Sequence, residues 1–254
     1  MLNIVRHGNP TDRPPLLIAH GLFGSARNWN AIARRLATGR EVLVPDMRNH
    51  GDSPWLASHG YPDLAADLAE VIEPDRPADV VGHSMGGKAA MMLALTRPEL
   101  VRRLIVADIA PVAYTHSQSD LIAAMKGLDL ATTPTTRTAM DERLAHDIAE
   151  PGVRAFLLQS LDLKADPPRW RLNLDVLDAE MPRIIGWPQS NGAVHDGPVI
   201  FLSGGESDYL RHEHRPAIRE LFPQARFATL RGAGHWLHAD QPRAFEETVR
   251  SILD

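Results

Sequence analysis

A serine that could act as a nucleophile lies in the run GHSMG at residues 82–86. The hydroxyl of Ser84 is a weak nucleophile until a base takes its proton and a third group orients that base. The flanking glycines lack Cβ atoms, so a strand and a helix can approach closely at a sharp turn around the serine. The motif therefore predicts covalent catalysis by Ser84, and the chain must also supply a histidine and a carboxylate.

The base is sought among the 12 histidines of the chain. His235 stands in GAGHWLHADQP, after the last predicted strand, where a loop can hold its side chain over the carboxyl edge of a sheet. His238 is the local alternative. We expect His50 in a polar loop and His59 and His116 in contact with solvent. We expect His212 and His214 at the surface, without a zinc site.

Two aspartates could orient the histidine. Asp108, in VADIAPVAY, ends the predicted strand that follows the helix after Ser84. Asp208, in SGGESDYL, ends the penultimate predicted strand. Because the carboxyl ends of parallel strands converge on one edge, either carboxylate can reach the site, and the other would cap a helix or order a loop.

Acyl transfer also needs donors for the negative oxygen that develops in the transition state, and fixed backbone N–H groups serve this purpose best. The Met85 N–H follows the nucleophile at the predicted helix start. The Leu22 N–H lies in HGLFGS at residues 20–25, a glycine-rich loop after the first long predicted strand. We predict these two groups as the oxyanion hole.

The elements that must position these groups alternate between apolar strands and helices. Such a βα rhythm predicts a mostly parallel, doubly wound sheet with helices on both faces. An edge strand is expected in LNIVRH. The predicted strands are residues 16–23, 41–47, 78–84, 103–111, 198–205 and 226–235, and the predicted helices are 26–38, 61–73, 85–98 and 241–253.

The rhythm breaks between residues 112 and 195, where helical periodicity continues without a convincing strand. We interpret this stretch as a helical cap over the strand ends, inserted before the penultimate strand into a core of residues 1–111 and 196–254.

Composition limits the remaining possibilities. The chain has 254 residues, enough for a large α/β core, and no cysteine, which excludes disulfides and fits a cytoplasmic location. A formal net charge of −5 with scattered arginines argues against nucleic acid as a partner. Neither a signal peptide nor an apolar run of about 18 residues is apparent, so we expect no membrane span.

Six segments carry a resemblance that covers nearly the whole chain, in the order HGLFGS, DMRNHGDSP, GHSMGGKAAM, VADIAPVAY, GGESDY and GAGHWLHAD. The chain resembles the α/β-hydrolase superfamily, specifically the small YbfF-type esterases. The resemblance implies a carboxylesterase or thioesterase for short to medium acyl esters, with a helical cap and no metal or organic cofactor. It also implies that the DIAP aspartate, Asp108, is the acid, although the wider superfamily favours the position of Asp208.

Other reactions on the same residues remain open: hydrolysis of C–C bonds, cofactor-free perhydrolysis, or ligand binding without turnover. A serine at position 84 argues against dehalogenases and epoxide hydrolases, which need a carboxylate nucleophile. We expect Arg48, Asn49 and His50 to order the loop beside the nucleophile. The candidates for an apolar acyl pocket, besides Leu22, are Phe23, Phe156, Leu157, Trp187 and Trp236.

Overall fold

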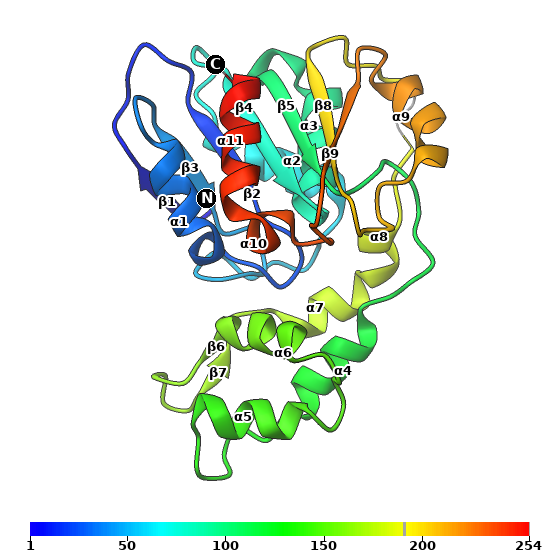
Figure 1. Ribbon diagram of the computed structural model, residues 1–254. Helices are drawn as coiled ribbons and strands as arrows, with labels where there is room; N and C mark the ends of the chain where they lie inside the picture. Colours follow the sequence, from blue (N-terminus) through cyan, green and yellow to red (C-terminus); the bar gives the residue numbers. More distant parts are fainter. Residues whose placement is uncertain (190–191, 254) are drawn as a thin grey trace.

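A seven-stranded sheet forms the centre of the computed structural model, which describes residues 1–189 and 192–253 (Figure 1). The strand order is β1-β3-β2-β4-β5-β8-β9, and β1 alone in this sheet is antiparallel to its neighbour. The strands are β1 (Ile4–His7), β2 (Leu16–Ala19), β3 (Val42–Pro45), β4 (Ala78–His83), β5 (Val101–Ala107), β8 (Val199–Gly204) and β9 (Arg226–Leu230).

Helices cover both faces of this sheet because successive strand residues point to opposite sides. In β2, Leu16 and Ile18 pack in one apolar cluster with α1, α10 and α11, whereas Leu17 and Ala19 pack in the other with α2, α3 and α9. The helices are α1 (Ala26–Leu36), α2 (Tyr61–Val71), α3 (Met85–Thr96), α9 (Arg215–Leu221), α10 (Leu237–Asp240) and α11 (Pro242–Leu253).

The predicted α/β fold is confirmed, including the edge strand at the N-terminal end. Every predicted core strand is present but ends earlier than expected; the first, for example, spans residues 16–19 rather than 16–23. The apolar runs continue past the last paired residue because their final residues form the loops that build the site.

A helical segment lies between β5 and β8 and forms a separate lobe below the sheet in Figure 1. The expectation that it holds no strand is wrong, because β6 and β7 pair as a short antiparallel ladder. Residues 190–191, inside the predicted cap range, and 254, the last of the core, lie outside the described residues. The elements of the inserted segment between β5 and β8 are α4 (Ser119–Gly127), α5 (Arg137–Leu144), α6 (Pro151–Leu157), β6 (Leu161–Asp162), β7 (Arg169–Trp170), α7 (Leu174–Ala179) and α8 (Met181–Ile185).

Lys88 of α3 joins the two ends of this inserted segment. Its buried ammonium group donates hydrogen bonds to the carbonyl oxygens of Val112 (2.8 Å), Ile185 (3.0 Å) and Gly186 (2.5 Å). Burial lowers the pKa of Lys88 to about 7. The helix that begins after Ser84 therefore also anchors the chain where it leaves the core and where it returns.

None of the helices in the described ranges 1–189 and 192–253 is both long enough and apolar enough to span a membrane.

Candidate active site

Ser84 occupies a strained turn between β4 and α3. Its φ of 53° and ψ of −120° place a non-glycine residue in a region that side chains disfavour. Gly82 and Gly86 make the turn possible, since a Cβ on the first would clash with the Gly86 carbonyl and one on the second with the Ala19 carbonyl. Both glycines of GHSMG are therefore required by close backbone approach, as the sequence predicts.

A continuous series of hydrogen bonds joins Ser84, His235 and Asp108. The Nε2 atom of His235 lies 2.9 Å from the Ser84 hydroxyl, and its Nδ1 atom lies 2.8 Å from a carboxylate oxygen of Asp108. Asp108 is fully buried, whereas the His235 side chain is 19% exposed. This arrangement lets the imidazole take the serine proton while the buried carboxylate fixes the ring orientation.

The alternative acid is not brought to the histidine, because the Asp208 side chain lies on the exposed side of its loop. Its two neighbours, Ser207 and Tyr209, point inward instead. The Ser207 hydroxyl donates to Asp108 Oδ2, and the backbone N–H of Gly204, at the end of β8, donates to Asp108 Oδ1 over 3.0 Å. The Tyr209 ring stacks on His235 with centroids 3.7 Å apart and planes at 19°. The loop that carries the second aspartate thus supports the first.

The HGLFGS loop lies directly against the nucleophile turn. A Cβ on Gly21 would come within 3.3 Å of the Ser84 Cβ, and Gly24 N–H closes a tight turn by donating to Gly21 O over 3.0 Å. Leu22 and Met85 line the same cavity as Ser84. Met85 opens α3, where the first N–H groups have no partner within the helix. The residues that carry the two predicted oxyanion donors therefore line the cavity beside the nucleophile, one from the HGLFGS loop and one from the first turn of α3.

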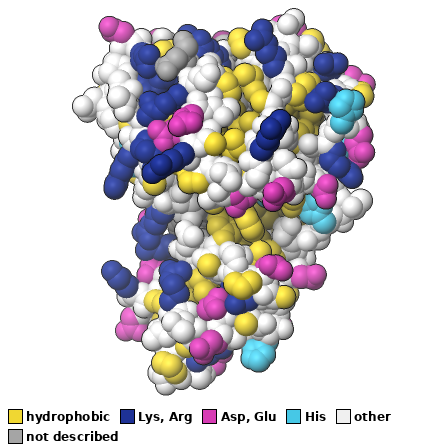
Figure 2. All heavy atoms as spheres, in the orientation of Figure 1, with side chains coloured by type: hydrophobic (Ala, Val, Ile, Leu, Met, Phe, Trp, Pro, Cys, Tyr) yellow, Lys and Arg dark blue, Asp and Glu magenta, His cyan; other side chains and the backbone are white. Residues whose placement is uncertain are grey.

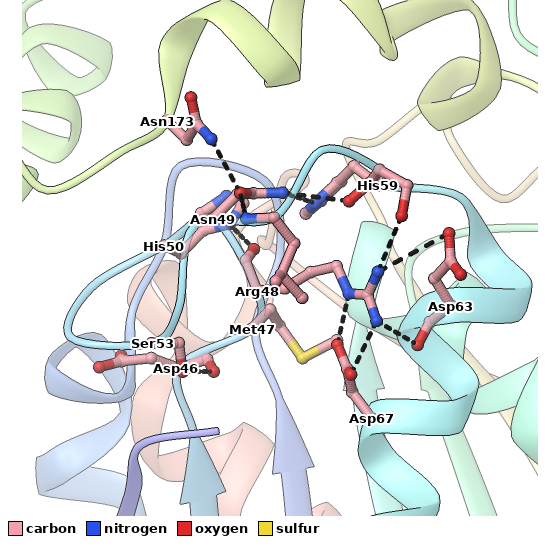
Figure 3. A network of polar contacts seen from close by, with 12 residues as sticks. Asp46, Met47, Arg48, Asn49, His50, Ser53, His59, Asp63, Asp67 and Asn173 are labelled. Carbon is pink, nitrogen blue, oxygen red and sulfur yellow. Dashed lines mark hydrogen bonds and ion pairs between the residues drawn. The ribbon is translucent and has the colours of Figure 1, made fainter. Parts of the chain in front are cut away.

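The DMRNHG loop is held by polar contacts on every side (Figure 3). Arg48 forms a two-pronged ion pair with Asp67 of α2, at 2.5 and 2.8 Å. His50 Nδ1–H donates to the Arg48 carbonyl, so its Nε2 accepts the Phe23 N–H over 3.1 Å. Asn49, with a φ of 64°, donates to His59. The prediction that these residues order the loop beside the nucleophile agrees with these contacts.

One expectation about the histidines is wrong, and the alternative base does not lie at the serine. His59 was expected at the surface but is 1% exposed, and its ring donates to the Met85 sulfur over 3.2 Å. His238, the alternative base, is buried against Trp29, with ring centroids 4.1 Å apart. Burial lowers the pKa of both rings to about 3. The local sequence around His59 and His238 does not indicate burial, since the burial of both side chains depends on tertiary packing.

A cavity of about 270 Å³ opens beside Ser84, between the core and the inserted helices. Figure 2 shows hydrophobic side chains gathered in the recess between these two parts. Four predicted pocket residues line it, namely Phe23, Phe156, Leu157 and Trp236, and so does Leu22. Lining residues that the sequence interpretation missed include Tyr61, Ile109, Tyr114, Leu121, Ile184 and Tyr209.

Trp187, the fifth predicted pocket residue, does not line the cavity. It follows α8 and packs near the ring of Tyr61, with centroids 6.1 Å apart. In the described residues, no three histidine, aspartate or glutamate side chains gather in a group that could hold a metal ion.

Comparisons with known proteins show the family of the chain. Residues 16–248 match the model of the alpha/beta hydrolase family. The chain belongs to this family. It is 42% identical to the sn-1-specific diacylglycerol lipase ABHD11 of Mus musculus, over 94% of this chain and 81% of the mouse protein. Esterase YbfF of Escherichia coli (strain K12) is 35% identical, over 97% and 95% of the two chains. A solved marine microorganism esterase has a TM-score of 0.92 and 37% identity, covering 99% of this chain and 98% of its own.

The two aspartates make a first prediction. Asp108→Asn should lower kcat for a p-nitrophenyl ester by about 10⁴, because the histidine loses the carboxylate that orients it. Asp208→Asn, at the exposed position in the neighbouring loop, serves as the matched control and should stay within about twofold of the parent. A larger loss in Asp208→Asn than in Asp108→Asn would contradict the geometric assignment.

The stacked ring of Tyr209 makes a second prediction. An aromatic face beside an imidazole that gains a proton stabilises the cation by about 1–2 kcal/mol when the site is shielded from water. Tyr209→Leu should therefore lower kcat about 5- to 30-fold, whereas Tyr209→Phe, which keeps the ring, should stay within about threefold. Equal losses in the two variants, measured by steady-state kinetics, would show that the ring face has no such role.

Six buried histidines make a third prediction. Burial lowers the pKa of each below its ordinary value of about 6.5, so the unfolded chain binds protons that the folded chain does not. Stability should therefore fall as the pH drops below about 6.5, by up to about 1.4 kcal/mol per pH unit for each ring that stays neutral in the folded state. The residues are His20, His50, His59, His83, His195 and His238.

Urea unfolding between pH 7.5 and 5.5 measures this slope. His238→Phe keeps a ring against Trp29 and should reduce the slope by the contribution of one proton. His212→Gln, at an exposed position, should leave it unchanged. A slope that is the same in His238→Phe and the parent would contradict the prediction.

Proposed function

We propose that the chain is a serine carboxylester hydrolase that works through an acyl-enzyme. The hydrogen-bonded series Ser84–His235–Asp108, at the wall of an apolar cavity, is the observation that carries this proposal. The names of the similar proteins, esterase YbfF, the marine esterase and the diacylglycerol lipase, support the same class of reaction.

In the first half of the reaction, Ser84 Oγ attacks the ester carbonyl while His235 Nε2 accepts its proton. The carbonyl electron pair moves onto oxygen, where the N–H groups of Leu22 and Met85 stabilise the charge. Collapse of this intermediate breaks the bond to the leaving group, which takes the proton from His235. Water, activated by the same histidine, then releases the acid and restores Ser84. Asp108 stabilises the imidazolium that forms in each half.

The substrate that the cavity suits is a short to medium acyl ester. Its volume of about 270 Å³ is just below the roughly 300–1,000 Å³ of pockets for drug-sized ligands. Phe156 of the inserted segment and Trp236 of the histidine loop pack against each other in its lining, with ring centroids 5.5 Å apart. A thioester can undergo the same steps. Hydrolysis of C–C bonds and perhydrolysis have no specific observation in their favour, and a cytoplasmic location stays a prediction.

A series of p-nitrophenyl esters tests this function. Each methylene that the cavity buries adds about 0.8 kcal/mol, so kcat/KM should rise from acetyl towards octanoyl and fall for palmitoyl, which exceeds the cavity. Ser84→Ala should lose activity by at least about 10³-fold without a change in unfolding temperature. Retained turnover in Ser84→Ala, or no turnover of any ester by the parent, would overturn the proposal.

A further inference from the structure

Phe23, in the middle of the HGLFGS loop, has a left-handed backbone. Its φ of 62° is costly for a bulky residue, and the side chain is 4% exposed, so water does not compensate its polar backbone groups. Two hydrogen bonds from outside the loop hold it. His50 Nε2 accepts the N–H over 3.1 Å, and the Ser160 hydroxyl donates to the C=O over 2.9 Å.

These two partners come from different parts of the molecule. His50 belongs to the core loop between β3 and α2, whereas Ser160 ends the short turn after α6 in the inserted segment. Ser160 is 5% exposed, so its hydroxyl has little access to other partners in solvent. The peptide group before Phe23 is therefore held by the core, whereas the hydrogen bond that holds the peptide group after Phe23 exists only while the inserted segment rests on the core.

A second series of hydrogen bonds leads from the inserted segment to Met85, which carries the other predicted oxyanion donor. Asn173, which precedes α7, donates its backbone N–H and its side-chain amide to Asn49, both over 3.0 Å (Figure 3). The Asn49 amide donates to His59 Nδ1 over 3.3 Å, and His59 Nε2–H donates to the Met85 sulfur over 3.2 Å. Met85 and Phe23, the residue after Leu22, are thus each linked to inserted residues by hydrogen bonds.

We propose that Ser160 is a positioning residue for the reaction: its hydrogen bond to the Phe23 carbonyl holds the HGLFGS loop so that the Leu22 N–H points to the oxyanion. This inference rests on the proposed function and gives the inserted segment a role beyond enclosing the acyl group. Because the effect acts on charge that exists only in the transition state, it changes kcat and leaves KM almost unchanged.

Ser160→Ala tests the inference. Loss of a whole oxyanion donor lowers kcat about 10²- to 10³-fold, and a displaced donor should cost less, so we expect a loss of about 10-fold with KM within about threefold. A trifluoromethyl ketone with an octyl chain adds to the serine and mimics the oxyanion. Its inhibition constant should rise by the same factor as kcat falls, whereas a merely structural defect would not couple the two.

Matched variants sharpen the result. Gln159→Ala removes a neighbouring contact between the inserted segment and the core, a 2.5 Å bond from Asn28, without touching Phe23, and both constants should stay within about twofold. Ser160→Thr keeps the hydroxyl and Ser160→Val replaces it with a methyl group at similar size. We expect Ser160→Thr to retain at least half of the parent kcat and Ser160→Val to match Ser160→Ala. If Ser160→Ala does not fold, the comparison of Ser160→Thr with Ser160→Val replaces it.

The outcomes separate the two proposals. If the parent hydrolyses esters and Ser160→Ala and Ser160→Val keep their kcat and ketone affinity, the role of Ser160 is overturned while the esterase stands. A fall in kcat without a matching loss of ketone affinity also overturns it. If the parent neither turns over esters nor binds the ketone, the proposed function falls, and this inference falls with it.

Discussion

The strained turn at Ser84 is the constraint on which the rest of the site depends. It lifts the serine hydroxyl above the sheet edge at the start of α3, and it is possible only because glycines at 82 and 86 let β4, α3 and β2 approach closely. The same geometry opens a helix whose first N–H groups have no partner within the helix. The position of the Ser84 nucleophile and that of one predicted oxyanion donor, the Met85 N–H, thus depend on the same backbone conformation.

Around that turn, support comes from loops that are far apart in sequence. The loop after β8 contributes Ser207 to Asp108 and Tyr209 to His235, so acid and base are fixed from one place. The loop after β3 contributes His50 and His59, which act as neutral hydrogen-bonding groups because burial lowers their pKa values. Neutral rings can form hydrogen bonds at positions that water does not reach. Because they must stay neutral in the folded state, they make that state less stable in acid.

Much of this could be predicted from residues alone. The GHSMG and HGLFGS loops have motif signals that depend on local chain geometry, and the βα rhythm indicated the sheet that places them at one edge. The errors have a common cause. His59 was expected in solvent and Trp187 in the cavity, but burial of a side chain depends on which distant segment covers it. The sequence pattern of a single loop does not indicate which distant segment packs over it.

The sequence by itself determined the fold class and the types of the reacting groups, since periodicity and glycine spacing act over a few neighbouring residues. It left two aspartates open, and only resemblance favoured Asp108. The tertiary structure places the Asp108 carboxylate on His235 and leaves Asp208 exposed, because the loop after β8 turns Ser207 and Tyr209, the neighbours of Asp208, toward Asp108 and His235. It also brings Ser160 to Phe23, a contact across 137 positions that depends on how the inserted helices pack on the core.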